Sequence, residues 1–346
     1  MALFGTPSAF LGLDIGSSSL KLVELVNRRR RIEIATYAQA SFPNLLINPQ
    51  GDERAAVSQT ADTVAAMLDR ANVSTDAVVA ALPNSVVFST VLTLPSLPEK
   101  EIDKAIHFAA RDVFPADLDD MVLGGSRLGE APHMDTDQTT NTSADLSTTA
   151  SAKAEAAAGE GAVPVFVTAA PKDIVNRYLK LMDILKLQLH ALEVETFPLV
   201  RSLFENVATA TGLVADIGDR TTTLHIIEAG TPRLSHTIEY GGYSLTSALA
   251  EKLGISAEEA EQQKIAHGLS ASGPPPLREA TLAALEPLVQ QARNLLGLYQ
   301  SQGGQPLSRT ILIGGGANLK DLTNFWQQAL GHVAVVGNPW RGLAYP

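Results

Sequence analysis

The sequence predicts a two-domain α/β fold with a duplicated core, and three stretches of the chain lead to this prediction. Residues 10–25 read as an apolar strand, an Asp-Ile-Gly turn rich in serine, and a second apolar strand. Residues 213–228 repeat this pattern. Residues 310–322 read as a buried strand that leads into a triple-glycine turn and a helix. The repeat indicates two similar halves, the second of which carries the glycine-rich turn.

The turn of the first unit has the composition of a phosphate site. Its residues are Asp14, Gly16, Ser17, Ser18 and Ser19. Backbone N–H groups of a Gly/Ser turn converge on an anion, hydroxyl groups add donors, and a carboxylate at the end of a strand can hold the water shell of Mg²⁺. Plain β-hairpins also carry Asp-Ile-Gly turns, so both interpretations stay open for this segment alone.

The corresponding turn in the second half contains Asp216, Gly218 and Thr221, with two larger residues between them. Arg220 could reach a phosphate, whereas Asp219 would repel one. The glycines Gly314, Gly315 and Gly316 would let a flat ligand lie against bare backbone. Together the three stretches predict a nucleotide cleft between two similar halves.

The order of these motifs resembles the actin/Hsp70/sugar-kinase ATPase superfamily, and within it the PilM family of type IV pilus assembly, which is related to FtsA. The resemblance covers nearly the whole chain and implies an actin-like fold, with two RNase H-like domains and a small inserted α+β subdomain of the FtsA/PilM type. It rests on residues 12–15, 21–25, 216–218, 221–224, 241–242, 245–246 and 314–316.

The resemblance also implies the ligand and the roles of the site residues. The ligand would be Mg-ATP, with Asp14 and Asp216 orienting the hydrated metal. Phosphates would lie at the two turns, and adenosine would pack on the three glycines. The implied nucleotide-binding residues are Asp14, Gly16, Ser17, Ser18, Ser19, Lys21, Asp216, Gly218, Arg220, Thr221, Glu261, Lys264, Gly314, Gly315 and Gly316.

The resemblance also implies a catalytic residue, and this assignment and one pair of the nucleotide-binding residues each have an ordinary structural alternative. Glu195 matches the position where the superfamily often carries the residue that positions the attacking water, and it would equally serve as a carboxylate at a helix N-terminus. Glu261 and Lys264 match the pair that contacts ribose and base, and they would equally form a solvated ion pair three residues apart on a helix.

The expected domains follow from the motifs. Residues 8–84 and 172–207 form the first RNase H-like domain, residues 85–171 the inserted subdomain, and residues 208–346 the second domain. The insert would contain a strand at 86–94 and a helix at 99–113, and a helix at 196–208 would link the halves. Residues 131–162 are rich in Thr, Ser, Ala and Gly and predict a disordered loop.

The composition of the chain argues against several classes of protein. Lysine and arginine total 26 against 37 acidic residues, a formal net charge of −11, which argues against a general nucleic-acid binder. The absence of cysteine excludes disulfides and thiolate metal sites. No apolar run is long enough to span a bilayer, and no signal peptide is evident, so we expect a cytoplasmic protein with peripheral membrane contact only.

By resemblance, the chain is the ATP-binding component of a type IV pilus, or related secretion, assembly platform at the inner membrane, with weak or absent hydrolysis. Expected partners are the cytoplasmic N-terminal peptide of a PilN-like membrane protein, other platform proteins, and a second copy of the chain. Phe88 and Phe114 belong either to the core of the insert or to a groove for that peptide. The basic residues 28–31 form either a solvated turn or a site for acidic lipid or a partner.

Two alternatives belong to other classes. An FtsA-like, filament-forming division protein would need a membrane-targeting tail, which the sequence does not show. A small-molecule kinase of the same superfamily would need a substrate pocket with a catalytic carboxylate, and no sharp motif indicates one.

Overall fold

The computed structural model describes residues 8–29, 31–43, 45–47, 52–95, 97–111, 113–114, 118–127 and 162–344. The chain divides into two compact units. Unit 1 comprises Met1–Ser202 and Trp340–Pro346, and unit 2 comprises Leu203–Pro339. The expected division instead placed residues 203–207 in the first half and 340–346 in the second. Most of the expected disordered loop, residues 131–161, lies outside the described residues, whereas Ala162 begins a strand.

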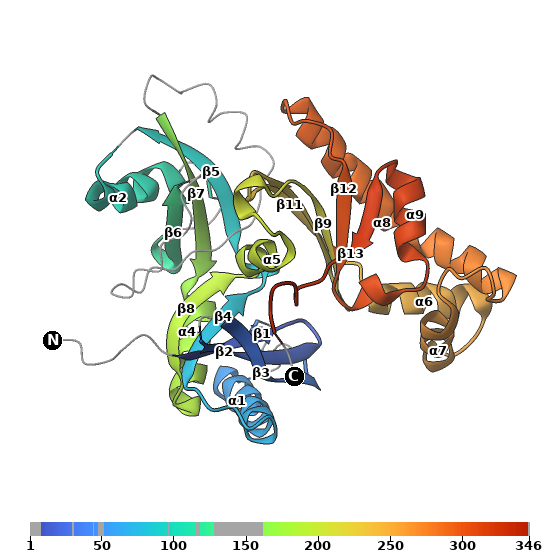
Figure 1. The fold of residues 1–346 in the computed structure, drawn as a ribbon, viewed down its shortest axis with the longest axis horizontal. Helices are drawn as coiled ribbons and strands as arrows, with labels where there is room; N and C mark the ends of the chain where they lie inside the picture. Colours follow the sequence, from blue (N-terminus) through green and yellow to red (C-terminus); the bar gives the residue numbers. More distant parts are fainter. Residues whose placement is uncertain are drawn as a thin grey trace. The chain divides into compact units, whose positions relative to one another are not determined.

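Unit 1 is built on a five-stranded sheet in the order β3-β2-β1-β4-β8 (Figure 1). Strands β1 to β3 form an antiparallel meander, and β4 and β8 continue the sheet parallel to β1. The parallel strands therefore end at the same edge of the sheet, where the first phosphate-type turn begins. The strands are β1 Ala9–Ile15, β2 Ser19–Arg28, β3 Arg31–Ser41, β4 Ala77–Leu82 and β8 Gln188–Val194.

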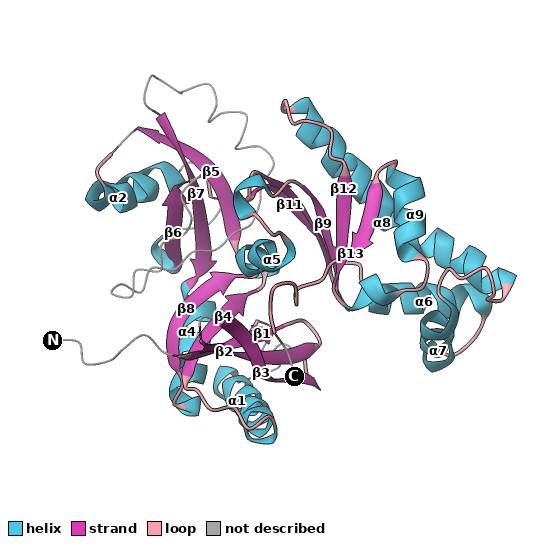
Figure 2. Ribbon diagram, viewed as in Figure 1, coloured by secondary structure: helices cyan, strands magenta, loops and turns pink. Residues whose placement is uncertain are grey.

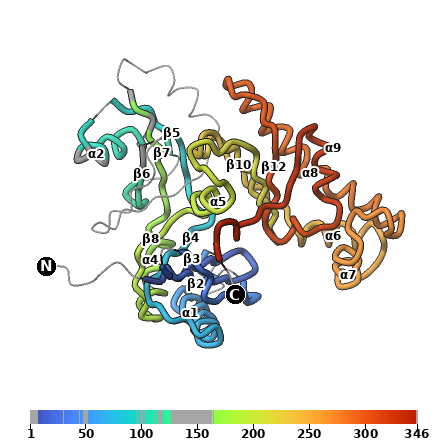
Figure 3. The backbone as a smooth tube through the Cα atoms, viewed as in Figure 1, coloured from blue at the N-terminus to red at the C-terminus, as the bar shows by residue number. Residues whose placement is uncertain are grey.

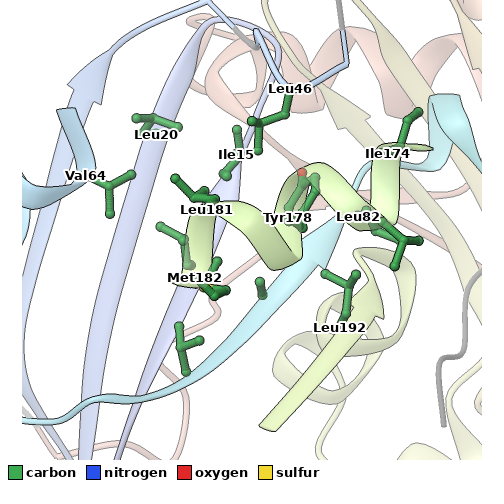
Figure 4. Packing of buried hydrophobic residues seen from close by; sticks show 14 of the residues in the cluster. Ile15, Leu20, Leu46, Val64, Leu82, Ile174, Tyr178, Leu181, Met182 and Leu192 are labelled. Atoms are coloured by element: carbon green, nitrogen blue, oxygen red, sulfur yellow. The ribbon is translucent and has the colours of Figure 1, made fainter. Parts of the chain in front are cut away.

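The helices α1 and α4 bury an apolar face on this sheet. Helix α1 (Glu53–Arg70) is capped by Asp52, whose side chain accepts a hydrogen bond from the backbone N–H of Arg54, and α4 spans Lys172–Leu185. Figure 4 shows part of the resulting core, with Tyr178 of α4 among aliphatic side chains from the strands and from α1. One acid also lies in this region: Glu24 of β2 is 1% exposed and accepts hydrogen bonds from the backbone N–H and hydroxyl of Ser74.

The inserted subdomain lies between β4 and α4 in the sequence and has the expected α+β composition. Its antiparallel sheet has the order β5-β7-β6, with β5 Phe88–Pro95, β6 Met121–Arg127 and β7 Ala162–Pro171. Helix α2 (Glu99–Ala110) contacts β5 and β6, as Figure 2 illustrates. Short 3₁₀ helices precede β5 and β6, η1 at Asn84–Val86 and η2 at Leu118–Asp120.

Unit 2 repeats the topology of unit 1. Its sheet has the order β11-β10-β9-β12-β13, with β9 to β11 antiparallel and β12 and β13 parallel to β9. The strand order corresponds element by element to that of unit 1, so the predicted duplication is confirmed. The strands are β9 Gly212–Ile217, β10 Thr222–Glu228, β11 Thr231–Ile238, β12 Arg309–Ile313 and β13 Val333–Val336.

The helices of unit 2 follow β11 and β12. Helix α7 is capped by Ser256, whose hydroxyl accepts the backbone N–H of Glu259, the arrangement that a Ser-x-x-Glu sequence favours. The long helix α8 contacts α6, α9, β10 and β11. The helices are α6 Gly242–Leu253, α7 Ala257–His267, α8 Pro275–Ser301 and α9 Leu322–Leu330.

Several helices differ from their expected bounds. The helix expected at 196–208 ends at Leu203 as α5 (Thr196–Leu203), and a separate 3₁₀ turn, η4, follows at Val207–Thr209. Asn206 caps that turn by accepting the N–H of Ala208 at 3.0 Å, which offers the backbone an alternative to continuing the helix. The triple-glycine turn also leads into a 3₁₀ helix, η5 (Gly315–Asn318), before α9 begins.

The segment after unit 2 returns to the edge of β3 (Figure 3). The N–H of Ile34 donates to the carbonyl of Ala344 at 2.8 Å, and the N–H of Ala344 donates to the carbonyl of Ile32 at 3.1 Å. The rings of Tyr37 and Trp340 lie 6.5 Å apart, centroid to centroid. Part of an otherwise open strand edge is thereby paired.

A fully buried histidine in unit 2 predicts a pH-dependent stability. His225 of β10 is 0% exposed, and its Nδ1 lies 2.7 Å from the hydroxyl of Ser235. Burial lowers the pKa of His225 to about 3. Between the ordinary histidine pKa and this value the unfolded chain binds a proton that the folded chain does not, so folding is favoured at higher pH.

We therefore predict that the free energy of unfolding falls by about 2 kcal/mol from pH 7 to pH 5 on account of His225. The double variant His225→Leu/Ser235→Ala removes both partners. Urea unfolding at the two pH values should show that its free energy of unfolding no longer falls by this amount. His107 is exposed on α2, so His107→Gln is the control and should show the same fall in the free energy of unfolding as the wild type. An unchanged pH dependence in the double variant would show that another group is responsible.

Candidate functional site

The first turn is closed by its own backbone. The N–H of Gly16 donates to the carbonyl of Ser19 at 2.9 Å, and the N–H of Phe42 donates to the carbonyl of Ser18 at 3.0 Å. Asp14 and Lys21 lie directly opposite each other on β1 and β2, and Lys21 Nζ is 2.8 Å from Asp14 Oδ2. Their side chains are 41% and 49% exposed, so water screens this pair and a ligand has access to both groups.

Glu195 follows β8, and the 3₁₀ helix η1 begins just after β4, which neighbours β8 in the sheet. Glu195 Oε1 accepts the backbone N–H of Asn84 at 3.0 Å. The side chain of Asn84 is buried and accepts the hydroxyl of Thr196 at 2.7 Å. Glu195 is half-buried and thus satisfies a backbone donor at the start of η1, in addition to any role with a ligand.

Tyr178 adds a buried hydroxyl near these carboxylates that the sequence did not single out. The residue is 0% exposed, and among the described residues its hydroxyl has no hydrogen-bond partner. Burial first, and then the negative charges of Asp14 and Glu195, raise the pKa of Tyr178 above its ordinary range. Tyr178 stays neutral at physiological pH and keeps a proton that it could donate.

In unit 2, the second turn is bonded to the start of α6. The N–H of Gly218 donates to the carbonyl of Thr221, that of Gly242 to the carbonyl of Gly218, and that of Tyr243 to the carbonyl of Asp219, all at 2.9 Å. A Cβ on Gly241 would lie 2.5 Å from the carbonyl oxygen of Asp219, so only glycine permits this approach. The first two backbone N–H groups of α6 are therefore hydrogen-bonded to the turn.

Arg220 has two contacts beside this turn. Its guanidinium Cζ lies 3.9 Å from the centroid of the Tyr243 ring, and its Nε is 3.4 Å from Asp219 Oδ2. The side chains of Arg220 and Asp219 are 56% and 41% exposed. The expected repulsion between Asp219 and a phosphate is thus partly offset, because its carboxylate is paired with a cation.

Glu261 and Lys264 form a clamp in which Lys264 is largely buried while the Glu261 side chain is 45% exposed. Lys264 Nζ lies 2.6 Å from Glu261 Oε2, 2.7 Å from the hydroxyl of Thr246 and 3.0 Å from the carbonyl of Gly242, with the Lys264 side chain 12% exposed. Burial raises the pKa of Glu261, but hydrogen bonds from Lys264 and Thr246 more than offset it and hold that pKa below its ordinary value. The clamp ties α7 to the start of α6.

The glycine turn after β12 lies against the end of β9. A Cβ on Gly314, whose φ is +79°, would lie 2.5 Å from Asp216 Oδ1, and one on Gly316 would lie 2.2 Å from Ile217 Cγ2. A Cβ on Gly315 would meet no atom within 4 Å. Gly314 and Gly316 therefore allow the backbone to approach β9, while Gly315 presents an open surface.

Within each unit, the structure thus places the expected site residues close to one another. In unit 2, the second turn, the α6–α7 clamp and the glycine turn are connected by the contacts described above. In unit 1, the first turn and Glu195 lie at the same sheet edge. Asp14 lies near the end of β1 and Asp216 near the end of β9. Within the described ranges no group of three or more His, Cys, Asp or Glu residues forms a direct metal site.

Phe88 and Phe114 both contribute to the core of the insert. Their ring centroids are 6.5 Å apart, and Phe114 is 8% exposed. An open cavity of about 340 Å³ lies elsewhere on the insert, next to α2, η2 and β6. It is lined by Ile106, His107, Leu118, Asp119, Met121, Leu123, Gly124 and Lys172.

Two units of this topology, each with its own turn of the phosphate-binding type, define an actin-like ATPase fold. The family model described as "Type IV pilus assembly protein PilM" matches residues 12–145 and 152–346. The chain therefore belongs to the PilM family of type IV pilus assembly proteins, as the resemblance in sequence predicted.

Solved structures support the fold. The chain is similar to a structure of the PilM–PilN type IV pilus biogenesis complex, with a TM-score of 0.75 and 24% identity over 97% of this chain and 90% of that one. It is also similar to the ethanolamine utilization protein EutJ from Carboxydothermus hydrogenoformans, with a TM-score of 0.56 and 16% identity, covering 96% of this chain and 85% of EutJ. A third similar structure, MreB 5 of Spiroplasma citri bound to AMPPNP, has a TM-score of 0.51 and 12% identity, covering 96% and 92%.

Among the helices in the described part of the chain, none combines the length and apolar character needed to cross a membrane.

We predict that Gly314→Ala destabilises the protein by about 1–3 kcal/mol, because it combines a positive φ with a clash against β9. Gly331 is the matched control: its φ is +77° but nothing lies within 4 Å of an added Cβ, so Gly331→Ala should cost less. Gly315→Ala should be neutral within about 0.5 kcal/mol. Urea unfolding of the three variants tests the order, and equal costs at positions 314 and 331 would contradict the close approach.

Proposed function

We propose that this PilM family member binds Mg-ATP and uses it in the assembly platform of a type IV pilus. The observation that carries the proposal is the glycine turn of unit 2, where Gly314 allows contact with Asp216 and Gly315 is left open as a surface for adenosine. The structural relative MreB 5, which was solved bound to AMPPNP, supports this ligand.

Each unit would contribute its own turn to the nucleotide. The phosphates would accept hydrogen bonds from the turn at residues 16–19, with Lys21, and from the turn of Gly218 and Thr221, with Arg220. Asp14 and Asp216 would hold Mg²⁺ through water, a metal that bridges and neutralises phosphate oxygens when bound. Glu261 and Lys264 would contact ribose and base. The contacts between Lys264, Glu261 and Thr246 hold the two side chains in place before the ligand binds.

We propose that hydrolysis is slow or absent. Glu195 already accepts the N–H of Asn84 at 3.0 Å, so one carboxylate oxygen is engaged in holding the start of η1. A carboxylate committed to a backbone donor is a weaker candidate for activating water. Nucleotide occupancy, rather than turnover, would then set the state of the protein.

Titration calorimetry with Mg-ADP and with Mg-AMPPNP tests the ligand. The wild type should bind both, and Gly315→Leu should weaken binding at least about tenfold because its side chain fills the adenosine surface. Gly297→Leu adds the same side chain at an exposed site on α8 with nothing within 4 Å and is the control. Well-folded wild type that binds neither nucleotide would refute the ligand and leave the family assignment intact.

We further propose that the chain binds the cytoplasmic N-terminal peptide of a PilN-like membrane protein and is held by it at the cytoplasmic face of the inner membrane. The related structure is a PilM–PilN complex, which supports this class of partner. The cavity on the insert offers the place: its wall includes the apolar side chains of Ile106 and Leu123, and exposed His107 and Lys172 contribute polar groups. Apolar side chains of an extended peptide would enter it.

Fluorescence anisotropy with the labelled peptide tests this placement. The double variant His107→Glu/Lys172→Glu changes exposed residues of the cavity without touching the core, and we expect at least about tenfold weaker binding. Arg54→Glu, an exposed change on α1, is the control. Substitution of Phe88 or Phe114 is less informative because both residues support the insert. Undiminished binding of the peptide by the folded double variant would show that the peptide does not bind in this cavity.

A further inference from the structure

The charge of the chain is unevenly distributed. The net charge is −11, yet residues 28–31 of the sequence are four consecutive arginines. Of these, Arg28 ends β2 and Arg31 begins β3. Arg28, Arg29 and Arg31 are exposed. The pairing of Arg28 with Glu33 is long, at 3.7 Å, and its side chain remains 70% exposed. The turn is therefore a local positive site on an acidic protein.

Large apolar side chains are exposed along the same strand. Ile32 of β3 is 41% exposed and Tyr37 is 71% exposed. Trp340, in the segment that pairs with β3, is 43% exposed, and its ring contacts that of Tyr37. Because Ala344 is hydrogen-bonded to Ile32 and Ile34, this segment and β3 form one surface within unit 1.

We propose that this surface docks directly on a membrane rich in anionic lipid. The "β3 patch" consists of Arg28, Arg29, Arg31, Ile32, Tyr37 and Trp340. It extends over about 20 Å, because the six steps along the strand from Arg31 to Tyr37 each advance about 3.3 Å.

The composition of the β3 patch fits a lipid headgroup region. Each basic residue near an anionic surface strengthens binding about fivefold, so the three described arginines together supply about two orders of magnitude. Tyrosine and tryptophan prefer the membrane interface because each has an apolar ring with a polar group. The acidic remainder of the chain is repelled by such a surface, so it favours approach through the β3 patch. This contact is independent of any peptide partner.

The fluorescence of Trp340 can report contact between the β3 patch and a membrane. Its two tryptophans differ in environment, since Trp340 is 43% exposed and Trp326 is 0% exposed. Vesicles of phosphatidylcholine with 30% phosphatidylglycerol should shift Trp340 emission to the blue, and brominated lipid should quench it. Pure phosphatidylcholine vesicles should do neither. Trp326→Phe should keep the response and Trp340→Phe should lose it.

Sedimentation with the same vesicles measures the contribution of charge. The triple variant Arg28→Glu/Arg29→Glu/Arg31→Glu should reduce partitioning by at least about a hundredfold, and 0.5 M NaCl should have a similar effect on the wild type. The control Arg54→Glu/Lys104→Glu/Lys252→Glu changes net charge equally at exposed positions outside the β3 patch and should bind more than the triple variant. Equal binding to neutral and anionic vesicles, or equal loss in both triple variants, would overturn the proposal.

Discussion

The close approach of the backbone at Gly314 to Asp216 and Ile217 determines the arrangement of the loops in unit 2. An added Cβ at Gly314 would lie 2.5 Å from Asp216 Oδ1 and from the carbonyl oxygen of Ile217. The turn after β12 therefore rests on the end of β9, and the hydrogen bond from Gly242 to Gly218 attaches α6 to the same region. Loops fixed by backbone contacts leave their outer surface available to a ligand at little cost in ordering.

The sequence predicted the architecture because its strongest signals are local and occur twice. An apolar strand, an Asp-Ile-Gly turn and a second apolar strand fold into the same hairpin in both halves, and the remaining strands join in the same order. The capping residue Ser256 and the glycines after β12 likewise have roles that follow from their own chemistry. The family match over most of the chain confirms the interpretation.

Features that depend on contacts distant in sequence were not predicted. Tyr178 reads as one apolar position of an amphipathic helix, and only the folded sheet places its hydroxyl near Asp14 and Glu195. Glu24 is buried because Ser74, far along the chain, supplies donors that offset its desolvation. The return of residues 340–344 to β3 also has no local signal, since it is made by main-chain hydrogen bonds.

The central claim of the proposed function is that the turns after β1, β9 and β12 each contact a bound nucleotide. Hydrogen–deuterium exchange with and without Mg-AMPPNP tests it most directly, because ligand contacts slow the exchange of backbone amides in these turns. The account predicts slower exchange at residues 14–19, 216–221 and 314–316, with little change in the strands of the insert. Unchanged exchange in all three turns at saturating nucleotide, or protection confined to other segments, would contradict it.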